Sequence, residues 1–183
     1  MTIEIMGTVY PARYTVHAEN LIAQKIGGIE NLGAAMEKNG SAGAIDLFAF
    51  IAAALIEGGV QHGKVEGQLM GKDYLGPEPI SYETIIHMLQ PGEVLNLKDS
   101  IMDAIREGNK TNIELKKTAK KKERTVKVTT EWLKHTGLKS GLTLAETMSS
   151  TPGEIMDLAS CEAIDHGAKQ KIRMSFDDTL KVR

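Results

Sequence analysis

The longest apolar run in the chain occupies residues 42–56 and predicts the central helix of the fold. It contains no proline, is rich in alanine, leucine and phenylalanine, and is too long for an ordinary strand. At roughly 1.5 Å per residue such a helix would span about 22 Å, short of the ~30 Å of a bilayer core. We therefore expect a buried core helix, capped by Ser41 and ended at Gly58 and Gly59, and no membrane span.

Alternating apolar and polar residues at the N-terminus predict a β-hairpin. Its apolar positions are Ile3, Ile5, Val9 and Tyr10. A Met-Gly pair at positions 6 and 7 separates the two runs as a turn, and Pro11 either ends the second strand or confines it to an edge. Because a two-stranded hairpin is only marginally stable in water, we expect it to lie on the helices or to pair with another chain.

Helical periodicity continues along most of the chain up to residue 107. We expect helices over residues 15–26, 30–38 and 81–89, and a strongly amphipathic helix that begins near Val94 and ends at Gly108. Residues 58–80 differ, because glycine recurs there at every fourth position from 59 to 71. Each helical glycine costs roughly 1 kcal/mol relative to alanine, so we expect a loose helix or a mobile loop in this stretch.

The C-terminal part carries two helix-start signals in close succession. One capping box joins Thr143 to Glu146, and a second joins Thr151 to Glu154 with a proline at the first helical position. Upstream of both, an apolar stretch over residues 128–138 holds the only tryptophan, Trp132. These signals predict three short helices.

Charge divides the chain into three parts that match these patterns. Residues 1–107 carry a net charge of −7, residues 108–125 carry +5, and residues 126–183 carry none. Segment 108–125 combines a dense lysine run with few large apolar side chains, too few to offset the entropy of ordering, so we expect a linker or an exposed helical extension there. We therefore predict a mainly α-helical, multi-helix body with an N-terminal β-hairpin over residues 1–107, a basic linker over 108–125, and a small helical C-terminal module over 126–183.

Candidate chemistry changes this picture little. The five histidines lack metal-binding spacing, and the stretch from Gly67 to Lys72 departs from a phosphate-binding loop in its glycine spacing. Cys161 lies in a predicted helix, where we expect a small core residue, and a single cysteine excludes an internal disulfide. We expect no catalytic, metal or cofactor site. The basic residues between 110 and 124 leave open an alternative function, a small nucleic-acid-binding regulator, although the acidic body would repel nucleic acid.

The order of these elements resembles that of the tail assembly chaperones of long-tailed bacteriophages. The resemblance begins at IEIMGTVYPARYT and continues through IGGIENLGAAMEKNG, LFAFIAAALIEGG and ISYETIIHMLQPGEVLNLKDSIMDAIREG. The segment EWLKHTGLKSGLTLAETMSSTPGEIMDL looks like the extension that such proteins gain when ribosomes shift frame near the end of the first cistron. The resemblance covers nearly the whole chain, and the glycine-rich stretch from 59 to 71 departs from it.

The resemblance implies a non-enzymatic protein of the host cytoplasm that leaves before the virion is complete. It would coat the tape-measure protein and recruit tail-tube subunits. Unpaired strand edges favour self-association through the hairpin near Ile3, Ile5, Val9 and Tyr10. We expect partner proteins to bind the C-terminal module through Trp132, Leu133, Leu138, Ile155, Met156 and Leu158.

The resemblance also predicts that the gene contains a frameshift site at the codons for Lys120, Lys121 and Lys122. Lysine codons are rich in adenine, and adenine runs allow a ribosome to slip. Sequencing the gene should reveal such a run, together with a shorter in-phase product that ends close to it. A single continuous reading frame without that product would show that the chain is made directly as one polypeptide.

Overall fold

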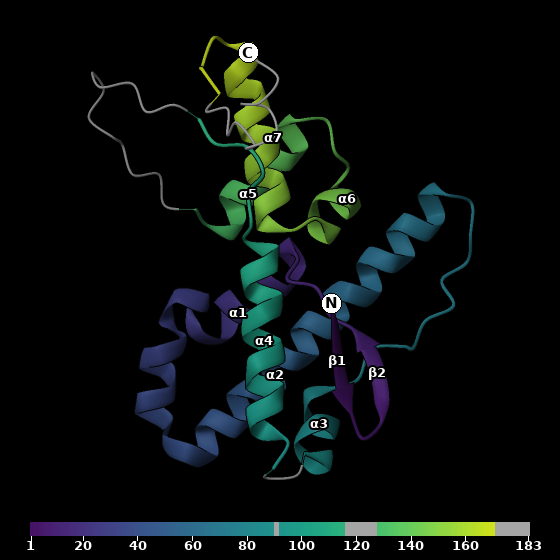
Figure 1. Ribbon diagram of the computed structural model, residues 1–183, viewed down its shortest axis with the longest axis vertical. Coiled ribbons are helices and arrows are strands. Elements are labelled where there is room, and N and C mark those ends of the chain that lie inside the picture. Colours follow the sequence, from purple (N-terminus) through teal and green to yellow (C-terminus); the bar gives the residue numbers. More distant parts are fainter. Residues whose placement is uncertain (90–91, 116–127, 171–183) are drawn as a thin grey trace, which may run out of the picture.

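The computed structural model describes residues 1–89, 92–115 and 128–170, and it shows the predicted mainly α-helical fold with an N-terminal hairpin (Figure 1). The hairpin strands are β1 (Thr2–Ile5) and β2 (Thr8–Pro11). The body continues with α1 (Val16–Ile26), the short 3-10 helix η1 (Ile29–Asn31), α2 (Leu32–Leu69), α3 (Tyr82–Met88) and α4 (Val94–Gly108). Helices α5 (Thr130–Lys139), α6 (Leu144–Ser149) and α7 (Pro152–Asp165) form the C-terminal module, which lies at one end of α4.

The hairpin forms where the alternation predicts it. Met6 and Gly7 make the turn with φ angles of 50° and 75°, the positive values that a two-residue hairpin turn of type I′ requires. Ile3 and Ile5 point into the main core and are 1% and 5% exposed. Strand β1 packs on α4 and strand β2 on α2, so the hairpin is stabilised by the helices beneath it.

Helix α2 is longer than the sequence predicts. It runs as one 38-residue element with a break at Gly40, whose φ of 63° and ψ of −169° are not helical. The helices expected over 30–38 and 42–56 therefore meet at a glycine kink. The predicted end at Gly58 and Gly59 is wrong, because the helix continues to Leu69. The apolar run nevertheless forms the centre of the core, with Leu47, Phe48, Ile51, Leu55 and Ile56 all buried.

Glycine in the second half of α2 makes room for neighbouring segments of the chain. A Cβ atom on Gly59 would lie 2.5 Å from the carbonyl oxygen of Pro11, closer than real contacts allow. One on Gly63 would lie 2.8 Å from the ring of Tyr74, in the segment that returns from the end of α2. The glycines weaken the helix by propensity but permit this close packing, and of the two expected alternatives a helix, and not a loop, forms up to residue 69.

The connection between β2 and α1 is almost completely enclosed. Its buried residues are Ala12, Tyr14, Thr15 and Val16, none of them more than 3% exposed. Arg13 donates its backbone N–H to the carbonyl oxygen of Leu55 in α2 at 2.9 Å. Thr15 caps α1 by accepting the backbone N–H of Ala18 at 3.2 Å. This short segment therefore ties the hairpin, α1 and α2 together.

The two predicted capping boxes are present in the C-terminal module. In each box the threonine side chain accepts the backbone N–H of the glutamate, and the glutamate carboxylate accepts the threonine N–H at 2.8 Å. Helix α5 packs against both α6 and α7, and the three helices contact α1, α2 and α4 of the body. The boundaries at 107 and 126 stay predictions, since residues 116–127 lie outside the described part of the chain.

One helix in the described residues is long and apolar enough to cross a membrane, over Gly43–Leu69. Within its apolar window 61% of the residues are buried inside the protein. The segment packs against α1, α3 and α4. This matches the expected core helix of a folded protein.

We predict that Gly59→Ala destabilises the fold by about 1–3 kcal/mol, because the added methyl group has to displace the backbone at Pro11. Urea or thermal unfolding followed by circular dichroism measures this. Gly33→Ala is the matched control in the same helix, since a Cβ there meets nothing within 4 Å. Alanine at Gly33 should be neutral or stabilise by up to about 1 kcal/mol. Equal effects at both positions would contradict the packing role of the glycine stripe.

Candidate interaction surfaces

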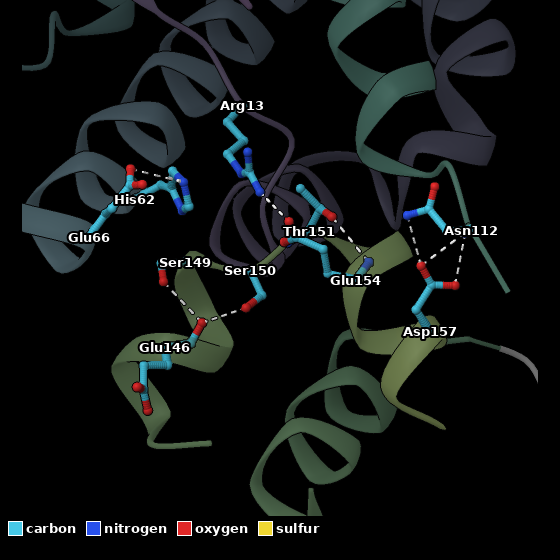
Figure 2. Close-up of polar contacts among 10 residues, drawn as sticks. All are labelled: Arg13, His62, Glu66, Asn112, Glu146, Ser149, Ser150, Thr151, Glu154 and Asp157. Carbon is cyan, nitrogen blue, oxygen red and sulfur yellow. Dashed lines mark hydrogen bonds and ion pairs between the residues drawn. The ribbon is translucent and has the colours of Figure 1, made fainter. Parts of the chain in front are cut away.

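The C-terminal module meets the body where α7 begins (Figure 2). The guanidinium group of Arg13 lies 2.5 Å from the carboxylate of Glu154. Beside this ion pair, Val16 donates its backbone N–H to the carbonyl oxygen of Ser150 at 2.8 Å. Arg13 belongs to the enclosed connection between β2 and α1, and Val16 is the first residue of α1, so the segment that organises the body also holds the module.

A second polar contact lies about one turn further along the same face of α7. Asn112 donates its backbone N–H to the carboxylate oxygens of Asp157 at 2.9 and 3.0 Å, and its side-chain amide donates to the same group at 3.1 Å (Figure 2). Ile113 adds a further backbone N–H at 3.0 Å. The chain leaving α4 is therefore fastened along α7 before it reaches residue 116.

The apolar core of the module is small and is shared with the body. Leu133 and Ile155 are 2% and 0% exposed, and they pack with Val16 at the start of α1. The half-buried residues around them are Trp132, Leu142, Met148 and Leu158. Because so few large side chains are fully buried, the module depends on the body for part of its stabilisation.

The carboxylate of Glu154 has two roles at this junction. One oxygen accepts the backbone N–H of Thr151 in the capping box, and the other pairs with Arg13. Burial by itself raises the pKa of this carboxyl, but the hydrogen bonds from Thr151 and Arg13 and the charge of Arg13 outweigh it and leave the pKa below its ordinary value. The start of α7 and its attachment to the body therefore depend on the same ionised group.

A hollow of about 160 Å³ opens beside this ion pair. Its charged lining consists of Arg13, Glu107, Lys110 and Glu154, with Asn112 beside them. The Nε atom of Arg13 is buried and has no hydrogen-bond partner among the described residues. These charged groups form two ion pairs, Arg13 with Glu154 and Lys110 with Glu107 at 3.7 Å. We interpret the hollow as part of the polar interface between the body and the module.

The end of α2 and the chain that returns from it form an arm that projects from the body (Figure 1). Lys64 in α2 pairs with Glu78 of the returning chain at 2.8 Å and lies over the ring of Tyr74. Three large apolar side chains on this arm are exposed: Leu69 at 70%, Met70 at 60% and Leu75 at 95%. Solvent-exposed apolar groups gathered on a projection are typical of a protein-binding surface.

The four residues predicted for self-association do not share one surface. Ile3 and Ile5 are buried in the core of their own chain, so their side chains are not available to a second copy. Val9 is 53% exposed and Tyr10 is half-buried against the core. Self-association through the hairpin stays a prediction, and it would have to use the strand backbone and Val9.

The predicted partner-binding residues likewise fall into two groups. Leu133 and Ile155 form the buried centre of the module and cannot contact a partner in this structure. The more accessible residues are Trp132, Leu138, Met156 and Leu158, of which Leu138 is 48% exposed. The amphipathic pattern locates the apolar faces of these helices, but it does not show which members of a face are covered by α1.

Other predicted positions also have a place in the structure. Cys161 lies in α7 as predicted, but it is exposed, so its assignment as a core residue is wrong. The described residues contain no group of three or more side chains able to hold a metal ion. Of the basic segment 110–124, only residues 110–115 belong to the described chain, and the lysine run lies outside it.

We predict that Glu154→Gln makes the protein less sensitive to acid. A carboxyl whose pKa is lower in the folded state stabilises the fold fully above its unfolded value of about 4.3, and this contribution is lost as the pH falls through the folded pKa. Glutamine still serves a capping box but removes the charge opposite Arg13. Because both partners are partly exposed, the loss at pH 7 should stay near or below about 1 kcal/mol.

Urea unfolding between pH 3 and pH 7 measures this effect, and hydrogen exchange at the Val16 amide reports whether the module remains attached. Glu146→Gln is the matched control, since Glu146 caps α6 in the same way without pairing with Arg13. Exchange at Val16 should accelerate in Glu154→Gln only. If the free energy of unfolding of Glu154→Gln fell with decreasing pH as steeply as that of the parent, the role assigned to Glu154 would be contradicted.

The comparisons with known proteins leave function to be inferred from these surfaces. No protein-family model, curated protein or solved structure matches the chain. We therefore infer function from three surfaces: the apolar arm, the partly exposed apolar face of the C-terminal module, and the edges of the hairpin.

Proposed function

We propose that this protein is a non-enzymatic tail assembly chaperone of a long-tailed bacteriophage, which binds the tape-measure protein and recruits tail-tube subunits in the host cytoplasm. The observation that carries the proposal is the arm with its exposed Leu69, Met70 and Leu75. The resemblance of the element order to that family, from the hairpin through the long apolar helix to the C-terminal helices, supplies the identity of the partners.

The arm is suited to contact another polypeptide. Its two limbs are fixed to each other by the Lys64–Glu78 ion pair and by the packing of Tyr74 on Gly63, so the exposed apolar side chains are presented on a supported element. A partner that covers these side chains removes apolar surface from water at roughly 25 cal/mol per Å². Little ordering of the arm would be required, which keeps the entropic cost of binding low.

The C-terminal module offers a second and separate surface. Leu138 and the half-buried Trp132 belong to α5, which lies at the far end of α4 from the hairpin turn (Figure 1). Two surfaces on one chain suit a protein that holds an elongated client with one and recruits subunits with the other. Many copies along one client would bind with avidity, because each further contact is intramolecular.

We predict that Leu69→Ser combined with Leu75→Ser weakens capture of the co-expressed tape-measure protein by roughly tenfold or more. Losing two exposed anchors removes about 1–2 kcal/mol or more of binding free energy, while surface substitutions leave stability within about 0.5 kcal/mol. Affinity purification from cells that express the neighbouring tape-measure and tail-tube genes measures the capture.

Leu95→Ser is the matched control, since Leu95 on α4 is 69% exposed and Leu69 is 70% exposed. It should leave capture unchanged. Leu138→Ser should keep the tape-measure protein bound and reduce recovery of the tail-tube protein. If the parent protein captures neither partner, the proposed function falls.

A further inference from the structure

The hydrogen-bond pattern of the hairpin determines which backbone groups point outward. Ala12 donates its N–H to the carbonyl oxygen of Met1 at 3.0 Å, next to the pairing of Thr2 with Pro11. Hydrogen-bonded and non-hydrogen-bonded pairs alternate along an antiparallel ladder, so Ile3 and Ile5 bond to β2. The N–H and C=O groups of Thr2 and Glu4 therefore point away from β2, along the outer edge of β1.

The outer edge of β2 is closed by its own sequence and by α2. By the same alternation its outward residues are Val9 and Pro11. Pro11 has no N–H to offer, and proline is a common way to block pairing at a sheet edge. Helix α2 also covers this end of the strand, since Gly59 packs against the Pro11 carbonyl.

No segment among residues 1–89, 92–115 and 128–170 pairs with the outer edge of β1. Within the described residues no hydrogen bond joins the outward groups of Thr2 or Glu4 to another part of the chain. A groove of about 310 Å³ lies beside the end of this edge that is nearer the turn, and residues 3–5 of β1 and the turn residues 6 and 7 line one side of it. Because successive side chains alternate between faces, a lining of consecutive residues means that the groove follows the strand edge and not one face of the sheet.

The opposite wall of the groove comes from the end of α3 and the start of α4. Its apolar residues are Leu89 and Leu97, and its polar residues include Asn96 and Ser100. Glu4 and Glu93 add acidic groups to the lining. The groove therefore combines an unpaired strand edge, an apolar floor and a negative charge.

We propose that the outer edge of β1 binds an extended segment of a partner polypeptide, which adds a third strand to the hairpin. The segment carries apolar side chains at alternate positions, which pack on the half-buried Leu89, and basic side chains on the other face beside Glu4. Main-chain hydrogen bonds to Thr2 and Glu4 hold it, and the alternate side chains give selectivity.

A second copy of this chain fits the edge less well than a separate extended segment. Two β1 strands paired about a twofold axis would place both α4 helices on the same face of the joined sheet, where they compete for the same space. An extended segment has no such wall of its own. The net charge of −7 over residues 1–107 further favours a basic partner.

The inference deepens the proposed function, on which it rests, by adding the β1 edge to the arm as a second contact with the elongated client. Its test uses the full chain and a probe that requires no phage protein: a blocked seven-residue peptide of alternating lysine and valine. At saturating peptide, hydrogen exchange by NMR should slow at the amides of Thr2 and Glu4. The same peptide with proline in place of its central valine should give no protection.

Glu4→Pro tests the edge directly, because it removes an outward N–H and leaves the ladder to β2 intact. Peptide affinity should fall by roughly tenfold or more. Val9→Pro is the matched control, since Val9 is the direct partner of Glu4 and its N–H points out from the opposite edge. It should change affinity less than about twofold. Circular dichroism checks that both variants fold, and the exchange measurement on the parent decides the question if either does not.

Unprotected Thr2 and Glu4 amides at saturating peptide would overturn the proposal, as would equal peptide affinity of folded Glu4→Pro and the parent. Capture of the tape-measure protein provides a separate readout. If the parent and Glu4→Pro capture it equally, the chaperone function stands and the edge proposal falls. If the peptide protects the edge but no tail protein is captured, the edge proposal stands and the phage function falls.

Discussion

The fold depends on one close crossing, at which residues 12–16 pass between α2, α4 and the C-terminal module. Cβ atoms added at Gly58 and Gly108 would lie 2.6 Å from the carbonyl oxygen of Arg13 and 2.7 Å from that of Tyr14. Backbones can approach this closely only where no side chain intervenes. The same five residues supply an anchor to α2, the cap of α1, the ion pair to α7 and the apolar residue that completes the core of the module. Hairpin, helices and module are positioned relative to one another at this crossing.

Local signals in the sequence were sufficient where the physical cause is local. The turn at Met6 and Gly7, the caps at Thr143 and Thr151, and the amphipathic face of α4 are each determined by a few neighbouring residues, and all are present in the structure. The end of α2 is different. Glycine at 58 and 59 indicates a helix end by propensity, yet the helix continues because those glycines pack against a segment that lies more than forty residues earlier in the chain. Tertiary packing, which has no local signature, decides this case.

The same limit applies to the interaction surfaces. Apolar periodicity identifies Ile5, Leu133 and Ile155 as members of apolar faces, but only the three-dimensional arrangement shows that these side chains are buried against other parts of the same chain. The exposure of Cys161 and of Leu75 could likewise not be predicted from the local sequence, because the number of neighbours around a side chain depends on elements distant in sequence. What remains exposed after packing, namely the arm and the β1 edge, is therefore a better guide to binding than hydrophobicity alone.

The sharing of Val16 between the body and the C-terminal module has a consequence for how the protein unfolds. A module whose central contact belongs to another part of the chain has no complete core of its own, so its opening exposes the start of α1 at the same time. Detachment of α7 also removes the charge partner of the Glu154 carboxylate, which caps that helix. Detachment of the module and unfolding at the start of α7 therefore favour each other. We expect the body and the module to unfold as one cooperative unit, although the long basic segment separates them in sequence. A partner protein held by the module would then stabilise the body as well, without touching it.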